Sequence, residues 1–269
     1  MKNNKDLFFI YLNEFNYKFL SSGAKKFNCK NILRLLKKNK TQTYTEDKIQ
    51  DKNLDPWVQN ISINIGVKSL KHKTFKLGEN APKKYIQIWD LLARNKITSM
   101  VWGPMNASYL KNRNLKLFFP DPWNFKNNTY PESLKYLNDL PNYYARNYLD
   151  IKIYKIIKYS FLFTLGIFIN KSFFSTIKNF LFYLKIFLKK NLKNYILFFI
   201  LDIISINILK KKIFEQKPNF SYIFLNSLAH FQHNNWDEKD KLKDYFLFSE
   251  IICKELIEIE KKYNSTIII

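Results

Sequence analysis

The sequence is poor in cysteine, histidine, arginine and glycine. Its 269 residues include two cysteines, three histidines, four arginines and five glycines. Cys29 and Cys253 form no C-x-x-C pair and cannot build a disulfide framework, which favours a reducing, cytoplasmic setting. The chain also has neither a glycine-rich phosphate loop nor a G-x-S-x-G nucleophile elbow. These absences exclude several common classes of nucleotide-binding and serine-hydrolase site.

The shortage of arginine changes the meaning of the charge. The formal net charge is +23, with 41 lysines beside the four arginines. Such a charge suits polyanions or an anionic membrane surface. Bidentate recognition of phosphates and guanine bases, however, depends mainly on arginine. Because lysine is abundant together with other residues that have A/T-rich codons, a biased genome explains the excess, and we do not expect nucleic acid to be the partner.

Apolar residues make up 46% of the chain, enough for a sizeable core. Short apolar runs predict buried strands, at residues 7–12, 97–102, 222–225 and the C-terminal "NSTIII". Helical spacing predicts helices, from about residue 17 onward and at residues 31–38, 86–93 and 238–262. The basic N-terminus has only a six-residue apolar run, too short for a signal peptide. The expected fold class is therefore α/β, a sheet flanked by helices.

Residues 149–217 have a different character from the rest. Proline is absent, Gly166 is the single glycine, and apolar residues alternate with lysine, which predicts about three helices. This gives an expected division into residues 1–148, a helical insertion or cap at 149–217, and a return to the core at 218–269. The run Phe161–Ile169 is too short to cross a bilayer, and Asp202 interrupts the run Tyr195–Leu209. A spanning helix, an amphipathic helix on an anionic membrane surface and helices packed on the core remain alternatives.

Polar residues follow three of the predicted strands, at Asn13–Glu14, at Asn106 and at Asn226 with His230. Ligands of open α/β sheets bind at the carboxyl ends of the strands, so a common sheet would place these residues along one edge. On a helix, His230 and His233 would share a face. They could bind a metal together with an oxygen ligand, although a histidine pair at this spacing more often has a role other than metal binding.

Five stretches in this order resemble the alkaline phosphatase superfamily, in particular its type I phosphodiesterase and nucleotide pyrophosphatase branch. They are "FIYLNEFNYKFL", "DPWVQNISINIGVKSLKH", "IWDLLARNKITSMVWGPMNAS", "FLNSLAHFQHNNW" and "NSTIII". The resemblance covers roughly residues 5–120 and 218–269. Gly66 and His72 match the glycine and histidine that follow the family's nucleophile. The helical middle would be the family's variable insertion.

The resemblance implies a two-metal site with zinc or another divalent metal, acting on a small-molecule or glycan phosphate or sulfate ester. The implied metal ligands are Asn13, Glu14, Asn226, His230 and His233. The implied catalytic residues are Glu14, Asp55 and Ser62, and the implied substrate-binding residues are Gln59, His72 and Asn106. Pro56 occupies the nucleophile position and has no nucleophilic atom.

Departures from the family pattern lower the expected activity. Asn13 and Asn226 stand where the family has metal-binding aspartates, and the chain ends before the family's Asp-His metal pair. We therefore expect a C-terminally truncated phosphoric-ester hydrolase or transferase that is weak or inactive by itself. The alternative is a non-catalytic basic module that binds polyanions or, as a peripheral protein, an anionic membrane surface.

Overall fold

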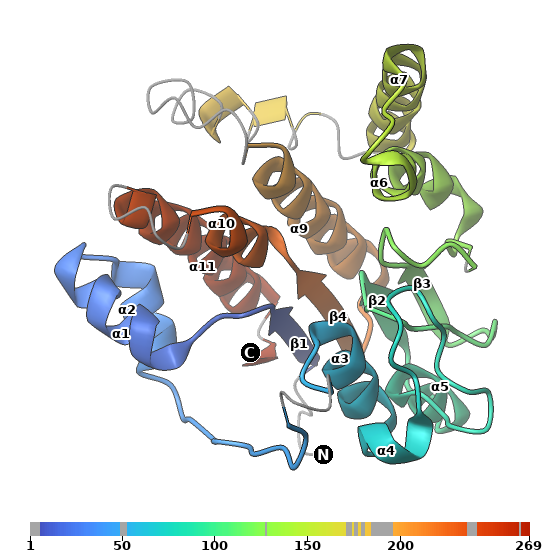
Figure 1. The fold of residues 1–269 in the computed structure, drawn as a ribbon, viewed down its shortest axis with the longest axis horizontal. Coiled ribbons are helices and arrows are strands. Elements are labelled where there is room, and N and C mark those ends of the chain that lie inside the picture. The colour runs from blue at the N-terminus through green and yellow to red at the C-terminus, as the bar shows by residue number, and fades with distance from the viewer. Residues whose placement is uncertain are drawn as a thin grey trace. The chain divides into compact units, whose positions relative to one another are not determined.

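A computed structural model describes most of the chain (Figure 1). The described residues are 6–48, 53–126, 128–170, 174, 177–178, 181–183, 196–235, 241–263 and 265–269. They form an α/β protein with a five-stranded parallel sheet flanked by helices, which confirms the expected α/β class. The order of the strands in the sheet is β3-β2-β4-β1-β5.

The strands are short and mostly buried, as expected for a parallel sheet. Their bounds are β1 Leu7–Leu12, β2 Ser99–Trp102, β3 Leu115–Phe119, β4 Phe220–Leu225 and β5 Thr266–Ile268. Strand β1 pairs with β5, and β2 pairs with both β3 and β4, in each case parallel. Leu7 lies opposite Thr266, and Ser99 lies opposite Phe220. The four strands that the sequence predicts are therefore present, whereas β3 was not predicted.

The helices include three that the sequence pattern missed. Their bounds are α1 Tyr17–Lys26, α2 Lys30–Leu36, α3 Pro56–Ile65, α4 Ser69–His72, α5 Ile88–Arg94, η2 Glu132–Leu134, α6 Lys135–Asn147, α7 Ile153–Ile169, α9 Ile196–Gln216, α10 Ser227–Asn235 and α11 Leu242–Tyr263. Helix α1 begins where Asn16 Oδ1 accepts the N–H of Phe19. Helices α3, α4 and α6 were not predicted. Pro56 begins α3, because proline is well suited to the first position of a helix.

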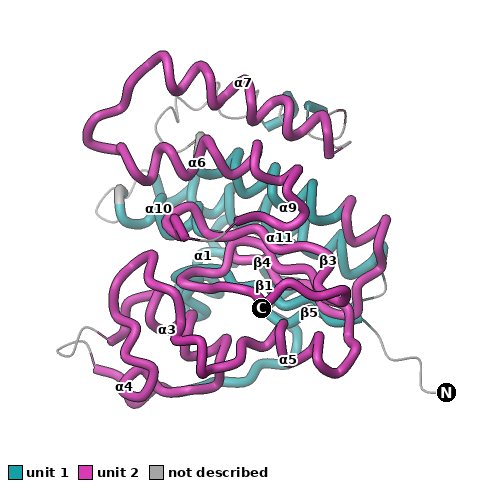
Figure 2. Tube along the Cα trace, turned by 90° about the vertical axis from the view of Figure 1, so that its right-hand side faces the viewer, with its two compact units in different colours: residues 1–44, 175–210, 225–269 teal, residues 45–174, 211–224 magenta. Residues whose placement is uncertain are grey.

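The chain divides into two compact units, shown in different colours in Figure 2. Unit 1 contains residues 1–44, 175–210 and 225–269, and unit 2 contains residues 45–174 and 211–224. This division differs from the expected one, because residues 149–217 are shared between the units and do not form a body of their own.

The core of unit 1 is organised by α11. Phe246 is fully buried, and its ring centroid lies 5.3 Å from that of Phe19 and 5.2 Å from that of Phe27. One buried acid also belongs to this helix: Glu255 accepts hydrogen bonds from Lys210 Nζ and Tyr183 Oη, both at 2.9 Å. These contacts satisfy a carboxylate that would otherwise be costly to bury.

The core of unit 2 is built around Trp89, which is fully buried on α5. Its indole ring lies 6.2 Å from Phe118 and 5.9 Å from Tyr222, measured between ring centroids. The indole N–H donates to the carbonyl oxygen of Ser108 at 2.9 Å. Trp89 thereby connects α5 with β3 and β4 and anchors the loop that follows β2.

Candidate functional site

Three candidate metal ligands of unit 1 form a chain of hydrogen bonds. Asn13 follows β1, Asn226 follows β4, and the N–H of Asn13 donates to the carbonyl oxygen of Leu225 at 3.1 Å. Asn13 Nδ2 donates to Asn226 Oδ1 at 2.7 Å, and Asn226 Nδ2 donates to His230 Nε2 at 3.2 Å. An amide nitrogen is a donor only, so His230 Nε2 must accept in this arrangement. The chain of donors therefore requires a neutral His230.

The surroundings of His230 favour the same neutral form. Burial lowers the pKa of His230 below its usual value, and the neighbouring His233 lowers it further. The imidazole also stacks on the ring of Phe198, with centroids 4.2 Å apart and an interplanar angle of 16°. His230 is thus held by an apolar ring on its face and an amide donor at its edge.

Glu14 contacts the second histidine of α10. His233 Nε2 lies 2.9 Å from Glu14 Oε1 and 2.8 Å from Oε2, and Gln232 Nε2 donates to the carbonyl oxygen of Glu14 at 3.3 Å. Glu14 has φ +58°, in the left-handed region that favours glycine. Holding glutamate there costs about 1–3 kcal/mol, and such strain is frequent at functional sites.

Asn13, Glu14, Asn226, His230 and His233 therefore lie close together, without Asn106, and we call these five residues the edge cluster. The reason is topological. Asn13 and Asn226 each come directly after a strand of the parallel sheet, and helix α10 begins immediately after Asn226. The three- and four-residue spacings along α10 then bring His230 toward Asn226 and His233 toward Glu14.

Asp202 on α9 lies beside the edge cluster and is not among the predicted site residues. Its Oδ2 accepts the N–H of Ser227, the first residue of α10, at 2.9 Å. Burial raises the pKa of Asp202 to about 6, although hydrogen bonds from the start of α10 oppose the rise. A carboxylate is favourable at a helix N-terminus. A single acid in an otherwise apolar run was the signal that could have identified it.

The edge cluster does not fit a two-zinc centre. Zinc sites are built from thiolates, imidazoles and carboxylates, and two cations need several negative ligands. Glu14 is the one carboxylate of the cluster, the two amides are neutral, and Asp202 is occupied at the helix terminus. Among the described residues, no group of three His, Cys, Asp or Glu side chains is arranged to hold a metal.

The remaining candidate residues lie in unit 2. Ser62 Oγ is 3.0 Å from His72 Nε2, and His72 is only 2% exposed although lysines flank it in the sequence. The backbone N–H of Thr74 donates to His72 Nδ1 at 3.1 Å, so Nε2 carries the proton of the neutral ring and donates to Ser62. A general base must instead accept the proton of the hydroxyl. The Ser62–His72 pair therefore has the wrong polarity for a nucleophile and its base.

Two further candidates on α3 have structural partners. Gln59 Nε2 donates to Asp47 Oδ2 and to the carbonyl oxygen of Asn53, both at 2.6 Å. Asp47 also accepts from Ser69 Oγ at 2.6 Å. Asp55 is the N-cap residue of α3, where its carbonyl oxygen accepts the N–H groups of Val58 and Gln59. These contacts tie the segment before α3 to α3 and α4.

Asn106 supports a neighbouring loop. It is 1% exposed, accepts the N–H of Gly78 at 2.6 Å, and donates to the carbonyl oxygen of Lys76 at 2.8 Å. Its φ of +51° is tolerated better by asparagine than by most residues. Both the oxygen and the nitrogen of the side-chain amide are thus hydrogen-bonded within the protein. Among the described residues, Asn106 makes no hydrogen bond to Ser62 or Gln59.

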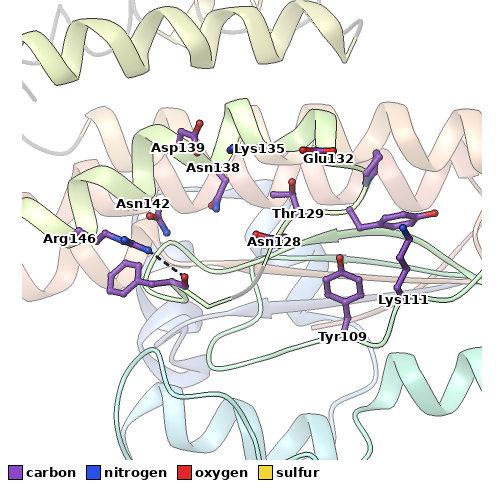
Figure 3. Close-up of a pocket in the computed structure, with 13 residues that line it drawn as sticks. Tyr109, Lys111, Asn128, Thr129, Glu132, Lys135, Asn138, Asp139, Asn142 and Arg146 are labelled. Carbon is purple, nitrogen blue, oxygen red and sulfur yellow. Dashed lines mark hydrogen bonds between the residues drawn. The ribbon is translucent and has the colours of Figure 1, made fainter.

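Unit 2 also contains a pocket of about 730 Å³, shown in Figure 3. Asn138, Asn142 and Arg146, spaced four residues apart on α6, line one side of it. Asn142 and Arg146 already donate to backbone oxygens of Pro122 and Phe125. Asn138 is 8% exposed, and its Oδ1 has no hydrogen-bond partner within the described part of the chain. Because this oxygen is itself buried, Asn138 presents no open acceptor to a ligand in the pocket.

The structure thus brings together the five residues of the edge cluster in unit 1 and, separately, Ser62 with His72 in unit 2. The comparison with protein-family models, with curated proteins and with solved structures found no match to this chain.

Proposed function

We propose that this chain is a degenerate phosphoric-ester hydrolase or transferase of the alkaline phosphatase type. In this proposal, the edge cluster binds a phosphate or sulfate ester, and the chain by itself turns the ester over weakly or not at all. One observation carries the proposal: Asn13 and Asn226 meet at the ends of two strands, where the resembled family places metal-binding aspartates, and they hydrogen-bond to each other.

The chemistry of the amides supports binding without rapid hydrolysis. An amide supplies hydrogen-bond donors to the oxygens of an ester but no negative charge to hold a divalent cation. Two adjacent carboxylates would repel each other without a metal, whereas two amides can bond directly, as Asn13 and Asn226 do. The polarity of Ser62 and His72 also leaves no activated hydroxyl at that pair.

The test restores the two carboxylates. We expect the double variant N13D/N226D to bind Zn²⁺ or Mn²⁺ at least tenfold more tightly than the natural sequence, because two charges are added where the amides now meet. Metal affinity is measured by competition with a chromogenic chelator. Turnover of bis(p-nitrophenyl) phosphate and p-nitrophenyl sulfate is measured in parallel, and the natural sequence should stay close to the uncatalysed rate.

The control is N28D, which adds a charge at an exposed position of unit 1 outside the edge cluster. It should leave metal affinity unchanged. Equal metal affinity of the natural sequence and N13D/N226D would show that the cluster has no geometry for a metal. Rapid turnover by the natural sequence, abolished in H230A, would show that the chain is an active enzyme.

A further inference from the structure

Helix α7 presents a broad apolar face to solvent. Of its 17 residues, only Gly166 and Ile167 are buried. Exposed apolar side chains occur along the whole helix, at Ile153, Tyr154, Ile157, Phe161, Leu165 and Ile169. Ile153 is 76% exposed, Ile157 is 65% exposed and Phe161 is 70% exposed, and their four-residue spacing aligns them on one side of the helix.

The opposite side of α7 is used for packing on α6. At Gly166, a Cβ atom would lie 3.0 Å from both Leu137 Cγ and Tyr136 Cβ, so the two helices approach closely there. The ring of Tyr159 lies 5.0 Å from that of Tyr143, whose hydroxyl accepts the N–H of Lys152 at 2.9 Å. Both views show α7 running beside α6 (Figures 1 and 2). Because α6 fixes the rotation of α7, the apolar face is held outward.

The charges of α7 have one sign. Lys155 and Lys158 lie within the helix, Lys152 is its N-cap residue, and residues 153–169 contain no Asp or Glu. Lys158 is exposed at the border of the apolar face. An apolar face with lysines beside it is typical of helices that lie in the interface of a membrane. Each lysine near an anionic surface adds a favourable contribution to such binding.

We propose that α7 attaches the protein to an anionic membrane surface by lying in the plane of the bilayer interface. None of the described helices is both long and apolar enough to cross a bilayer. Ile153, Ile157 and Phe161 would enter the region between headgroups and acyl chains, while Lys152 and Lys158 contact the headgroups. This inference does not depend on the chemistry of the edge cluster.

Charge distinguishes a membrane from a second copy of the chain as the occupant of this face. Parallel pairing of two α7 helices would bring Lys152, Lys155 and Lys158 of each copy together, and any pairing would join two molecules whose net charge is already +23. Like charges in contact are unfavourable. An anionic lipid surface instead complements the lysines and buries the apolar side chains at the same time.

The experiment is flotation of the full chain with vesicles of phosphatidylcholine alone or of phosphatidylcholine with about 30% phosphatidylglycerol. The second composition gives the vesicles a negative surface potential like that of an anionic membrane. We expect binding to the anionic vesicles, weaker binding at 0.5 M salt, and at least a tenfold loss in the double variant I157D/F161D. The matched control is L70D, which places a charge at an equally exposed apolar residue of α4. L70D should bind vesicles as the natural sequence does.

Three results would overturn the proposal. The natural sequence could fail to float with anionic vesicles, or L70D could lose as much binding as I157D/F161D. Light scattering could also show a dimer that I157D/F161D converts to a monomer, in which case a second copy covers the face. Circular dichroism of each variant verifies that a loss of binding is not a loss of folding.

Discussion

Helices α7 and α11 show that apolar content alone does not determine burial. Helix α11 buries eleven of its 22 residues, including a serine and a glutamate, whereas α7 buries two of 17 and carries exposed isoleucine, leucine and phenylalanine. The difference lies in the neighbours. Helix α11 packs against α1, α2 and α10 within unit 1, while α7 packs mainly against α6 within unit 2. One helix therefore forms a core, and the other presents a surface.

The largest expected effect is the difference in the loss of stability when one phenylalanine on each helix is replaced with alanine. Replacing Phe246 of α11 with alanine should lower the free energy of unfolding by about 3–5 kcal/mol, because a large buried ring is lost. Replacing Phe161 of α7 with alanine should change it by less than about 0.5 kcal/mol. Urea unfolding followed by circular dichroism measures both values.

If F246A does not fold, F246L gives the same contrast with a smaller loss, on the order of 1 kcal/mol. A large loss in F161A would break the comparison, because it would mean that the outward face of α7 is covered in the folded protein. Such a result would also remove the basis for membrane binding by this helix.

The sequence indicated where the residues of the edge cluster would lie, but not the polarity of the Ser62–His72 pair in unit 2. Asn13 and Asn226 could be expected along one edge because each directly follows a strand of a parallel sheet. Their direct contact depends on the strand order, in which β4 lies next to β1, and the sequence did not predict that order. The tautomer of His72 could not be predicted, because it depends on a backbone N–H of Thr74. The place of Asp202 depends on the packing of α9 against the start of α10, which local periodicity does not encode.

The two helices also differ in how far the sequence could predict them. The helix predicted from the apolar pattern of residues 238–262 corresponds to α11 from Leu242 onward, and residues 238–240 lie outside the described part of the chain. For residues 153–169 the same kind of pattern allowed a spanning helix, a surface helix or a packed helix. In the structure, α7 packs closely on α6 at Gly166, near Leu137, while Ile157 and Phe161 stay exposed. A hydrophobic pattern predicts a face, but only the neighbouring elements decide what covers it.

Two glycines sharpen the comparison by testing how tightly each unit is packed. A Cβ atom added at Gly23 of α1 would lie 1.8 Å from Phe246 Cζ, so G23A should lower the free energy of unfolding by about 1–3 kcal/mol. At Gly166 of α7 the closest atoms are 3.0 Å away. Replacing glycine with alanine inside a helix gains roughly 0.5–1 kcal/mol, so G166A should come out close to neutral.

The double variant G23A/F246L identifies the cause of the loss at Gly23. Removing the ring of Phe246 removes the atoms that the new methyl group would meet, so the two changes should be less destabilising together than their sum. Strict additivity would mean that helix α1 shifts away from α11 and that the interface is less constrained than the contact suggests.

The smallest expected effect is the dependence of stability on pH. His230 has a folded-state pKa below the ordinary value of 6.5, so the unfolded chain binds more protons once the pH falls below 6.5. The contribution of His230 is thus present above pH 6.5 and is lost as the pH falls. Protonation would also oppose the hydrogen bond from Asn226 Nδ2 to His230 Nε2. The unfolding midpoint should therefore fall more between pH 7.5 and pH 5 in the natural sequence than in H230Q.

Asp202 acts in the opposite direction and must be removed to see the whole effect of His230. Its pKa of about 6 lies above the unfolded value of 3.8, so its contribution grows as the pH falls through 6. In the variant D202N, whose amide oxygen can still accept the N–H of Ser227, the loss of stability on acidification should be steeper than in the natural sequence.

Vesicle binding by α7 should depend little on pH. Helix α7 has no His, Asp or Glu, and protonation of the nearby Asp139 would only remove a negative charge that partly neutralises Lys158. Binding to anionic vesicles should consequently persist at pH 5. A loss of binding at pH 5 would mean that the apolar face of α7 is not sufficient for membrane attachment and that an acid-sensitive group elsewhere is required.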